Sequence, residues 1–216
     1  YPDTVSEGSD NNYEFAYQDG TLTVSGQPAL KAQYRIRKHE KRPHDNHIKP
    51  HFQIVNTGSV PVKYTDLTLR YWYTKEGNAP EVFSCDYAAL GTSKVKGEYE
   101  NMDSAATGAD TYLEVSFTSA SLLATGRNSG EIQTRFNKTN WSDYNETNDY
   151  SYDPTKTSYS DWSNVTLYYK GILVWGNEPS GAVEEPEVPD GEVAVYPNPF
   201  AVVFTIKVNG HFLYII

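Results

Sequence analysis

Residues 67–73 read Leu-Thr-Leu-Arg-Tyr-Trp-Tyr, and this short stretch decides the fold. Large apolar side chains recur at every second position, namely Leu67, Leu69, Tyr71 and Tyr73. Successive side chains of a β-strand point to opposite faces, so a period of two predicts a strand with one buried face. Thr68, Arg70 and Trp72 belong to its other face.

The same alternation returns on both sides of this stretch. Residues 111–117 place Leu113, Val115 and Phe117 on one face. Residues 132–136 turn Ile132 and Phe136 inward, which leaves Gln133 and Arg135 side by side on the outside. Residues 165–169 and 172–175 flank Lys170-Gly171 in the manner of a hairpin. Short strands separated by Gly, Asn, Asp and Ser, without a convincing helical period, predict an all-β chain folded as an antiparallel β-sandwich.

Composition limits the classes of function. The chain has 216 residues, 14% of them aromatic, which is enough to form a core and argues against wholesale disorder. Its formal net charge of −10 argues against nucleic acid or an anionic membrane surface as a general partner. One basic segment departs from this balance, with Arg35, Arg37, Lys38, Lys41 and Arg42. It is either a solvated loop or a contact for a phosphate or carboxylate, and the sequence leaves both open.

Cys85 is the single cysteine, so an intrachain disulfide is excluded. Its apolar neighbours predict a buried thiol that behaves as a small hydrophobic side chain. No apolar run is long enough to span a bilayer. The chain starts at Tyr1 and not at Met, and we interpret it as part of a longer protein.

The chain divides into segments by composition. Residues 1–28 are expected to be a lead-in from a preceding module, and residues 29–179 the β domain. Residues 180–192 are rich in Glu and Pro and predict an extended linker. Residues 193–216 are apolar and strand-like but too short to fold alone.

Residues 135–150 form a polar stretch rich in oxygen ligands, which makes it the first candidate for a binding or metal site. Trp141 stands among Asn, Ser and Asp, where a tryptophan covers a core edge or serves as an exposed platform for a ligand. Asn145, Asn148 and Asp149 offer oxygen donors in a tight turn, which form either a hydrogen-bonded Asx turn or part of a calcium site.

Enzymatic interpretations find little support. A glycosidase needs two carboxylates that face each other, and no spacing among the abundant acids selects such a pair. The histidines His39, His44, His47 and His51 have no spacing typical of a zinc site. A non-catalytic protein is therefore expected.

Four stretches, in order along the chain, resemble the family 3 carbohydrate-binding modules, which bind cellulose. They are residues 48–58, residues 67–74 with 85–89, residues 109–117, and residues 135–150 with 171–176. The resemblance covers roughly residues 30–179, and it implies an antiparallel β-sandwich of jelly-roll topology. It also implies a secreted module that is covalently linked to a catalytic or scaffold module.

The resemblance implies a planar strip that binds crystalline cellulose or related β-glucans. By position the strip consists of Asp86, Tyr87, Arg135 and Trp141, with Gln133 and Asn46 as further polar contacts. A loop tyrosine of many relatives is missing, because residues 90–96 are short and contain no aromatic residue. The alternative function is a helper module that extends the cleft of an adjoining cellulase without binding crystalline cellulose itself.

Two further features follow from resemblance. The structural calcium of the family maps to Thr74, Glu76, Asn145, Asn148 and Asp149. The C-terminal stretch 195–210 resembles the start of a type IX secretion sorting domain, cut short and with a different continuation from His211 onward.

Overall fold

The structure is a computed structural model that describes residues 28–37, 42–180, 194–197, 204–208 and 211–215. Nearly all of the expected linker and of the expected lead-in lies outside these ranges, as do Lys38, His39 and Lys41 of the basic segment. Arg35 lies on the first strand, and Arg37 is exposed directly after it.

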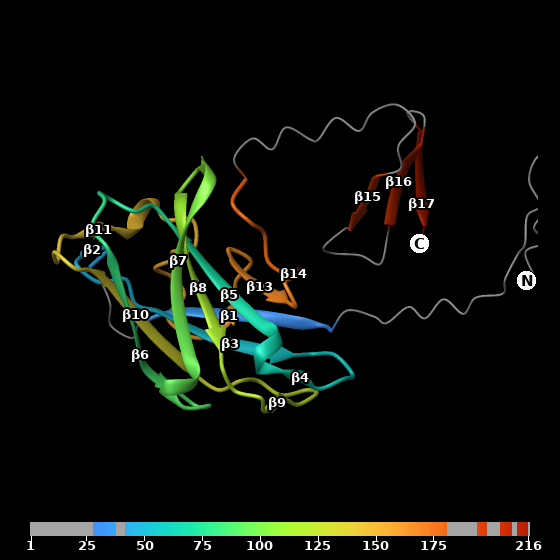
Figure 1. The fold of residues 1–216 in the computed structure, drawn as a ribbon, viewed down its shortest axis with the longest axis horizontal. Helices are drawn as coiled ribbons and strands as arrows, with labels where there is room; N and C mark the ends of the chain where they lie inside the picture. The colour runs from blue at the N-terminus through green and yellow to red at the C-terminus, as the bar shows by residue number, and fades with distance from the viewer. Residues whose placement is uncertain (1–27, 38–41, 181–193, 198–203, 209–210, 216) are drawn as a thin grey trace, which may run out of the picture.

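Two five-stranded antiparallel sheets form the domain (Figure 1). The first sheet runs, in spatial order, β12 (Ser160–Asp161), β1 (Leu30–Ile36), β3 (Pro50–Asn56), β10 (Ile132–Lys138) and β6 (Glu81–Ala88). The second runs β14 (Ile172–Trp175), β13 (Val165–Tyr169), β5 (Leu67–Tyr73), β8 (Ala109–Phe117) and β7 (Val95–Ala106). The predicted strand 67–73 is therefore the central strand of the second sheet.

Smaller elements complete the described chain. Two pairs of short strands are β2 (His44–Asp45) with β11 (Tyr144–Asn145), and β4 (Val62–Lys63) with β9 (Leu122–Leu123). The helical elements in the described ranges are short 3₁₀ turns, η1 (Tyr64–Asp66), η2 (Thr92–Lys94) and η3 (Glu146–Asn148). A three-stranded sheet near the C-terminus contains β15 (Ala194–Pro197), β16 (Phe204–Val208) and β17 (His211–Ile215), in agreement with the strand-like pattern there.

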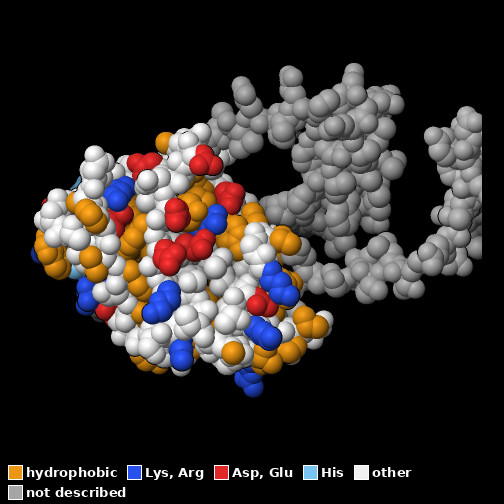
Figure 2. Space-filling model, in the orientation of Figure 1, with side chains coloured by type: hydrophobic (Ala, Val, Ile, Leu, Met, Phe, Trp, Pro, Cys, Tyr) orange, Lys and Arg blue, Asp and Glu red, His pale blue; other side chains and the backbone are white. Residues whose placement is uncertain are grey.

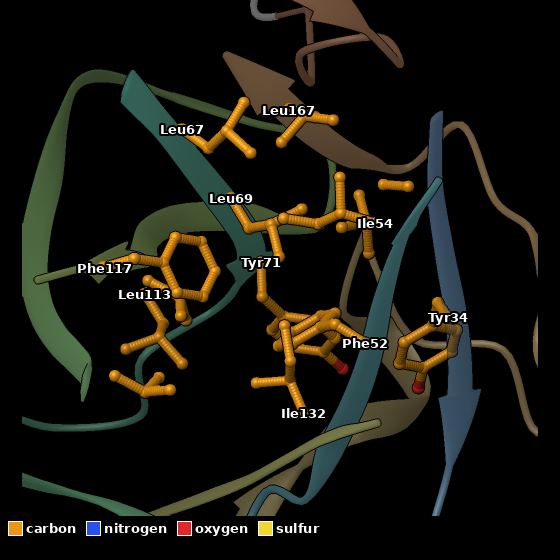
Figure 3. Packing of buried hydrophobic residues seen from close by; sticks show 14 of the residues in the cluster. Tyr34, Phe52, Ile54, Leu67, Leu69, Tyr71, Leu113, Phe117, Ile132 and Leu167 are labelled. Atoms are coloured by element: carbon orange, nitrogen blue, oxygen red, sulfur yellow. The ribbon is translucent and has the colours of Figure 1, made fainter. Parts of the chain in front are cut away.

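The core lies between the two sheets. Figure 3 shows side chains from both sheets pointing toward one another, with Tyr34, Phe52, Ile54 and Ile132 of the first facing Leu69, Tyr71 and Leu113 of the second. The predicted inward residues Leu67, Leu69, Tyr71 and Tyr73 are fully buried. Trp162 and Trp175 are partly buried and pack against the same core. The all-β sandwich is thus confirmed.

Cys85 is less buried than expected. It lies half-buried on β6, which forms the edge of its sheet, and its thiol approaches the carbonyl oxygen of Tyr87 at 3.5 Å. Partial burial, with the nearby charge of Asp86, raises the pKa of this thiol to about 11. The thiol is therefore protonated and unreactive at neutral pH.

The outer face of the second sheet is charged. The guanidinium of Arg70 lies 4.4 Å from the ring centres of both Tyr112 and Tyr168, and its Nε donates to Glu114 at 2.8 Å. Figure 2 shows acidic side chains gathered over β7 and β8 on this face. Within the described ranges, no helix has the length and apolar character needed to cross a membrane.

Candidate functional site

A β-bulge brings two consecutive residues of β6 to the outer face of the first sheet. Tyr87 pairs with Gln133 of β10 and Cys85 pairs with Thr134, so the register passes over Asp86. An extra residue on one strand breaks the alternation of faces. Asp86 and Tyr87 are consequently both exposed, Tyr87 to 50%, although neighbours on a regular strand would point in opposite directions.

Arg135 lies on the outer face of β10 and pairs with Asp86. Its Nε donates to Oδ1 of Asp86 at 2.8 Å and to Oδ2 at 3.1 Å. Gln133 lies two residues away on the same face, where its amide donates to Glu131 at 2.5 Å. Arg135 and Asp86, two residues of the expected strip, are therefore joined, and Tyr87 stands next to them across from Gln133.

Trp141 lies on the loop that follows β10 and is 55% exposed. Its backbone has a φ of 60°, in the left-handed region that bulky residues seldom occupy. The turn is closed by its own N–H, which donates to the carbonyl of Lys138 at 3.0 Å, and by Asn140, whose Oδ1 accepts from the N–H of Ser142 at 3.2 Å. Of the two interpretations, the exposed platform agrees with this geometry.

His47, which the sequence interpretation left out of the strip, contacts Trp141. The centroids of the two rings are 5.2 Å apart and their planes are inclined by 67°. Asn46, the preceding residue, is half-buried and donates its N–H to Asp45 at 2.7 Å. The charges of Arg135 and Asp86 both affect the pKa of His47, Arg135 lowering it and Asp86 raising it. The sequence signal that could have identified His47 is that it directly follows Asn46, a residue of the expected strip.

The proposed calcium ligands lie on two loops that meet. Asp149, after η3, is buried and accepts the N–H of Thr74 through Oδ1 at 2.9 Å. Glu76 accepts the N–H of Asn145 through Oε1 at 3.0 Å. The second oxygens of both carboxylates, Asp149 Oδ2 and Glu76 Oε2, are buried without a hydrogen-bond donor in the described part of the chain.

The surroundings of these oxygens fit a cation. Burial, with the charges of Glu76 and Asp110, raises the pKa of Asp149 to about 8. The ammonium of Lys138 is 3.7 Å from Glu76 Oε2 and also donates to the carbonyl of Asp143 at 2.8 Å. Orphaned carboxylate oxygens with carbonyls nearby are the hard donors that calcium takes.

The two asparagines of the predicted set are placed differently. Oδ1 of Asn145 accepts from the N–H and the hydroxyl of Thr147, so this amide forms the Asx turn that the sequence left open. Asn148 is exposed, and its carbonyl oxygen faces Gly108, where an added Cβ would lie 2.7 Å from it. No three Asp, Glu, His or Cys side chains gather as a metal cluster among the described residues, so any ion here depends on amide, hydroxyl and backbone oxygens as well.

A family model described as "Cellulose binding domain" (CBM_3) matches residues 31–176. The chain belongs to this family. The match covers both five-stranded sheets except Leu30, and every residue of the expected strip and calcium set. CBM3 members are non-catalytic binding modules within larger proteins.

Similar proteins agree with this assignment. Exoglucanase-2 of Thermoclostridium stercorarium is 47% identical over 135 residues, which are 62% of this chain and 15% of that protein. Cellulosomal-scaffolding protein B of Acetivibrio thermocellus is 41% identical over 160 residues, 69% of this chain and 20% of that protein. The chain therefore spans a fifth or less of the length of these curated relatives.

The fold has solved counterparts. The CBM3b module of the major scaffoldin subunit ScaA from Acetivibrio cellulolyticus superimposes with a TM-score of 0.66 at 38% identity, over 70% of this chain and 97% of that one. These relatives do not favour the alternative of a cleft-extending helper module.

Proposed function

We propose that residues 29–179 bind the flat face of crystalline cellulose through one surface, the strip, made of Asp86, Tyr87, Arg135 and Trp141 with Gln133 and Asn46. The observation that carries the proposal is the joining of Arg135 to Asp86 by two hydrogen bonds of 2.8 and 3.1 Å, beside the exposed ring of Tyr87. The bulge exposes Asp86 and Tyr87 together, which supports the proposal that these side chains form one binding surface.

The chemistry of this surface suits a glucan. Glucose rings present C–H bonds on their faces, onto which the apolar faces of Trp141 and Tyr87 can stack. Arg135, Asp86 and Gln133 supply donors and acceptors for hydroxyl groups. Because β6 and β10 hold most of these side chains on a sheet, little conformational entropy is lost on binding.

Binding tests should separate the forms of the polysaccharide. Purified protein is mixed with microcrystalline cellulose, phosphoric-acid-swollen cellulose or soluble cello-oligosaccharide, and bound protein is measured by depletion or calorimetry. The proposal expects the tightest binding to the crystalline form. Binding to the soluble oligosaccharide alone would contradict the flat surface and favour a cleft, while reducing-sugar release by the protein would contradict a non-catalytic module.

The same proposal places the module in a larger extracellular protein. The relatives are named as an exoglucanase and a cellulosomal scaffold, and either would gain from being held on its substrate. The strands of the C-terminal segment, β15 to β17, would belong to the sorting-domain-like tail. Export is tested by expressing the parent protein with and without this tail and detecting each form by antibody in culture medium from which the cells have been removed.

We further propose that Thr74, Glu76, Asn145, Asn148 and Asp149 hold one structural calcium ion. The support is the pair of buried carboxylate oxygens without donors, Asp149 Oδ2 and Glu76 Oε2, among the described residues. An ion between them would join the loop after β5 to the loop around η3, next to the Trp141 loop. Binding to the folded state alone stabilises it by mass action.

Thermal unfolding in calcium and in chelator tests this site. Calcium should raise the melting temperature of the wild type, and Asp149→Ala should remove the difference. Asp143→Ala is the matched control, because Asp143 is an exposed acid of the same loop that contributes its carbonyl to Lys138. Equal melting of the wild type in calcium and in chelator would refute the calcium site.

A further inference from the structure

His47 is held by a rigid segment. The next residue, Ile48, exchanges two backbone hydrogen bonds with Phe136 of β10, at 3.0 and 2.9 Å. The preceding Asn46 is tied to Asp45 at 2.7 Å. The imidazole therefore projects from a backbone that is fixed to the sheet carrying Arg135.

Trp141 needs such a fixed neighbour. It is exposed, and its own backbone is in the left-handed region at a φ of 60°. The hydrogen bonds of its turn fix the backbone but leave the side-chain torsions open. The imidazole of His47 stands against the indole at 5.2 Å between centroids, in an edge-on arrangement typical of favourable aromatic pairs.

We propose that His47 is a positioning residue that holds the Trp141 ring in the orientation used for binding cellulose. This inference rests on the proposed function of the strip. The ring contact and the anchored backbone of His47 carry it. Trp141 would then reach the glucan already oriented, so less side-chain entropy is lost on binding.

The charges around His47 determine how this role depends on pH. Lys49 and Asp45 lie on its own segment and form an ion pair at 3.1 Å, while Arg135 of β10 and Asp86 of β6 form another at 2.8 Å. Each of these two positive charges near His47 is thus paired with a negative charge. Partial burial, followed by the charge of Lys49, lowers the pKa of His47 below its ordinary value of 6.5, which favours the neutral ring.

Docked cellulose would remove further water from His47, which disfavours the charged imidazolium still more. The pKa should therefore be lower in the bound state than in the free state, and binding should release a proton from the protonated protein. By linkage, affinity is constant at neutral pH and falls as the pH drops through the free-state pKa.

Depletion isotherms on crystalline cellulose, at about pH 7.5 and about pH 5, test the proposal. His47→Ala should weaken binding roughly two- to tenfold at the higher pH, and should have no further effect in a Trp141→Ala background. The wild type should bind more weakly at the lower pH, whereas His47→Gln, which cannot titrate, should not. His44→Gln is the matched control and should behave as the wild type, because His44 is an exposed histidine on β2.

Tryptophan fluorescence tests the contact without cellulose. Protonated imidazole quenches an adjacent indole, so the wild type should show a pH-dependent emission change that His47→Gln and Trp141→Phe both lack. Its absence, or equal binding by His47→Ala and the wild type, overturns the positioning role. If the wild type shows this pH-dependent change in emission but does not bind cellulose, the proposed function of the strip is wrong. The role of His47 in binding is then wrong as well.

Discussion

Arg135 illustrates how the chemistry of one side chain shapes the candidate surface. Its Nε donates to both oxygens of Asp86, so one N–H of the planar guanidinium is shared between the two carboxylate oxygens. A lysine keeps the charge but has neither the plane nor the fork of donors. The pair is exposed, so its worth lies in the geometry that it presents more than in stability.

Arg135→Lys should therefore weaken binding to crystalline cellulose by roughly two- to fivefold while the melting temperature stays nearly unchanged. Depletion isotherms and thermal melts of the purified variant measure the two effects. Arg127→Lys, in an exposed turn whose backbone bonds to Asn56 at the end of β3, is the matched control. Full retention of affinity by Arg135→Lys would mean that charge alone matters at this position.

His51 is a residue whose burial links stability to pH. It lies on β3 between Arg35 of β1 and Gln133 of β10, and its side chain is almost wholly buried. Burial, and then the charge of Arg35, lowers its pKa to about 4 against an opposing contribution from Glu131. Arg37 lowers this pKa further and Asp86 raises it.

The unfolded chain binds a proton at His51 near pH 6.5, whereas the folded chain does so only near pH 4. The contribution of His51 to the free energy of unfolding should therefore fall as the pH drops from about 6.5 to about 4, by on the order of 3 kcal/mol, and should not vary above that window. Urea unfolding across this range measures the slope. His51→Gln should remove the His51 contribution from this slope, and an unchanged slope in that variant would show that His51 is not the group responsible.

At the scale of elements, the bulge in β6 determines which side chains reach the surface. A regular strand would have exposed either Asp86 or Tyr87 but not both. The extra residue between Cys85 and Tyr87 exposes both, at the edge of the sheet where bulges are frequent. The candidate surface thus depends on a local irregularity of a strand as much as on residue identity.

Strand β7 approaches β6 where the edges of the two sheets meet. Gly97 of β7 lies against the ring of Phe83 of β6, and a Cβ added to it would be 2.3 Å from the ring carbon Cδ2. Even a methyl group therefore requires Phe83 to move away from the core.

Gly97→Ala should lower the free energy of unfolding by about 1–3 kcal/mol through this overlap. The change should appear as a lower midpoint in urea with a similar slope. Combining it with Phe83→Leu should be less harmful than the two single changes added together, because the smaller side chain vacates the space. Strict additivity would mean that the two side chains do not meet.

The strands were predictable and the irregular parts were not. Alternation in 67–73 and 111–117 correctly predicted β5 and β8, and Lys170-Gly171 correctly predicted the β13–β14 hairpin, because core burial imposes a period of two. The bulge at Asp86 and the contact of His47 with Trp141 depend on pairing between distant segments, which a local pattern does not encode. Partial exposure of Cys85 follows from an edge position that composition alone could not assign.

At the scale of the whole molecule, the two sheets differ in the outer faces that they present. The second sheet carries acids such as Glu98 and Glu100 on β7 and Glu114 on β8. Figure 2 shows acidic side chains gathered over these two strands. The first sheet carries Arg135, Tyr87 and Gln133 on its outer face. Since cellulose is uncharged, the net charge of −10 neither helps nor opposes docking, and it favours solubility.

Because of this arrangement, binding and stability depend on different parts of the domain. One sandwich core supports both faces, so changes to the outer face of β10 and its loop leave the packing in Figure 3 intact. Affinity for cellulose and stability of the fold should therefore respond to different substitutions. Trp141 is the sharpest case, because its ring is exposed and belongs to neither sheet.

A depletion isotherm on crystalline cellulose for the wild type and Trp141→Ala tests the central claim most directly. Removal of one stacking face is worth roughly 1.5–3 kcal/mol, so the variant should bind about tenfold or more weakly, with an unchanged melting temperature. Trp72→Phe, a change in a buried indole of β5, is the control and should alter stability but not affinity. Equal binding by the wild type and Trp141→Ala, or a wild type that stays in solution, would contradict the assignment of the strip.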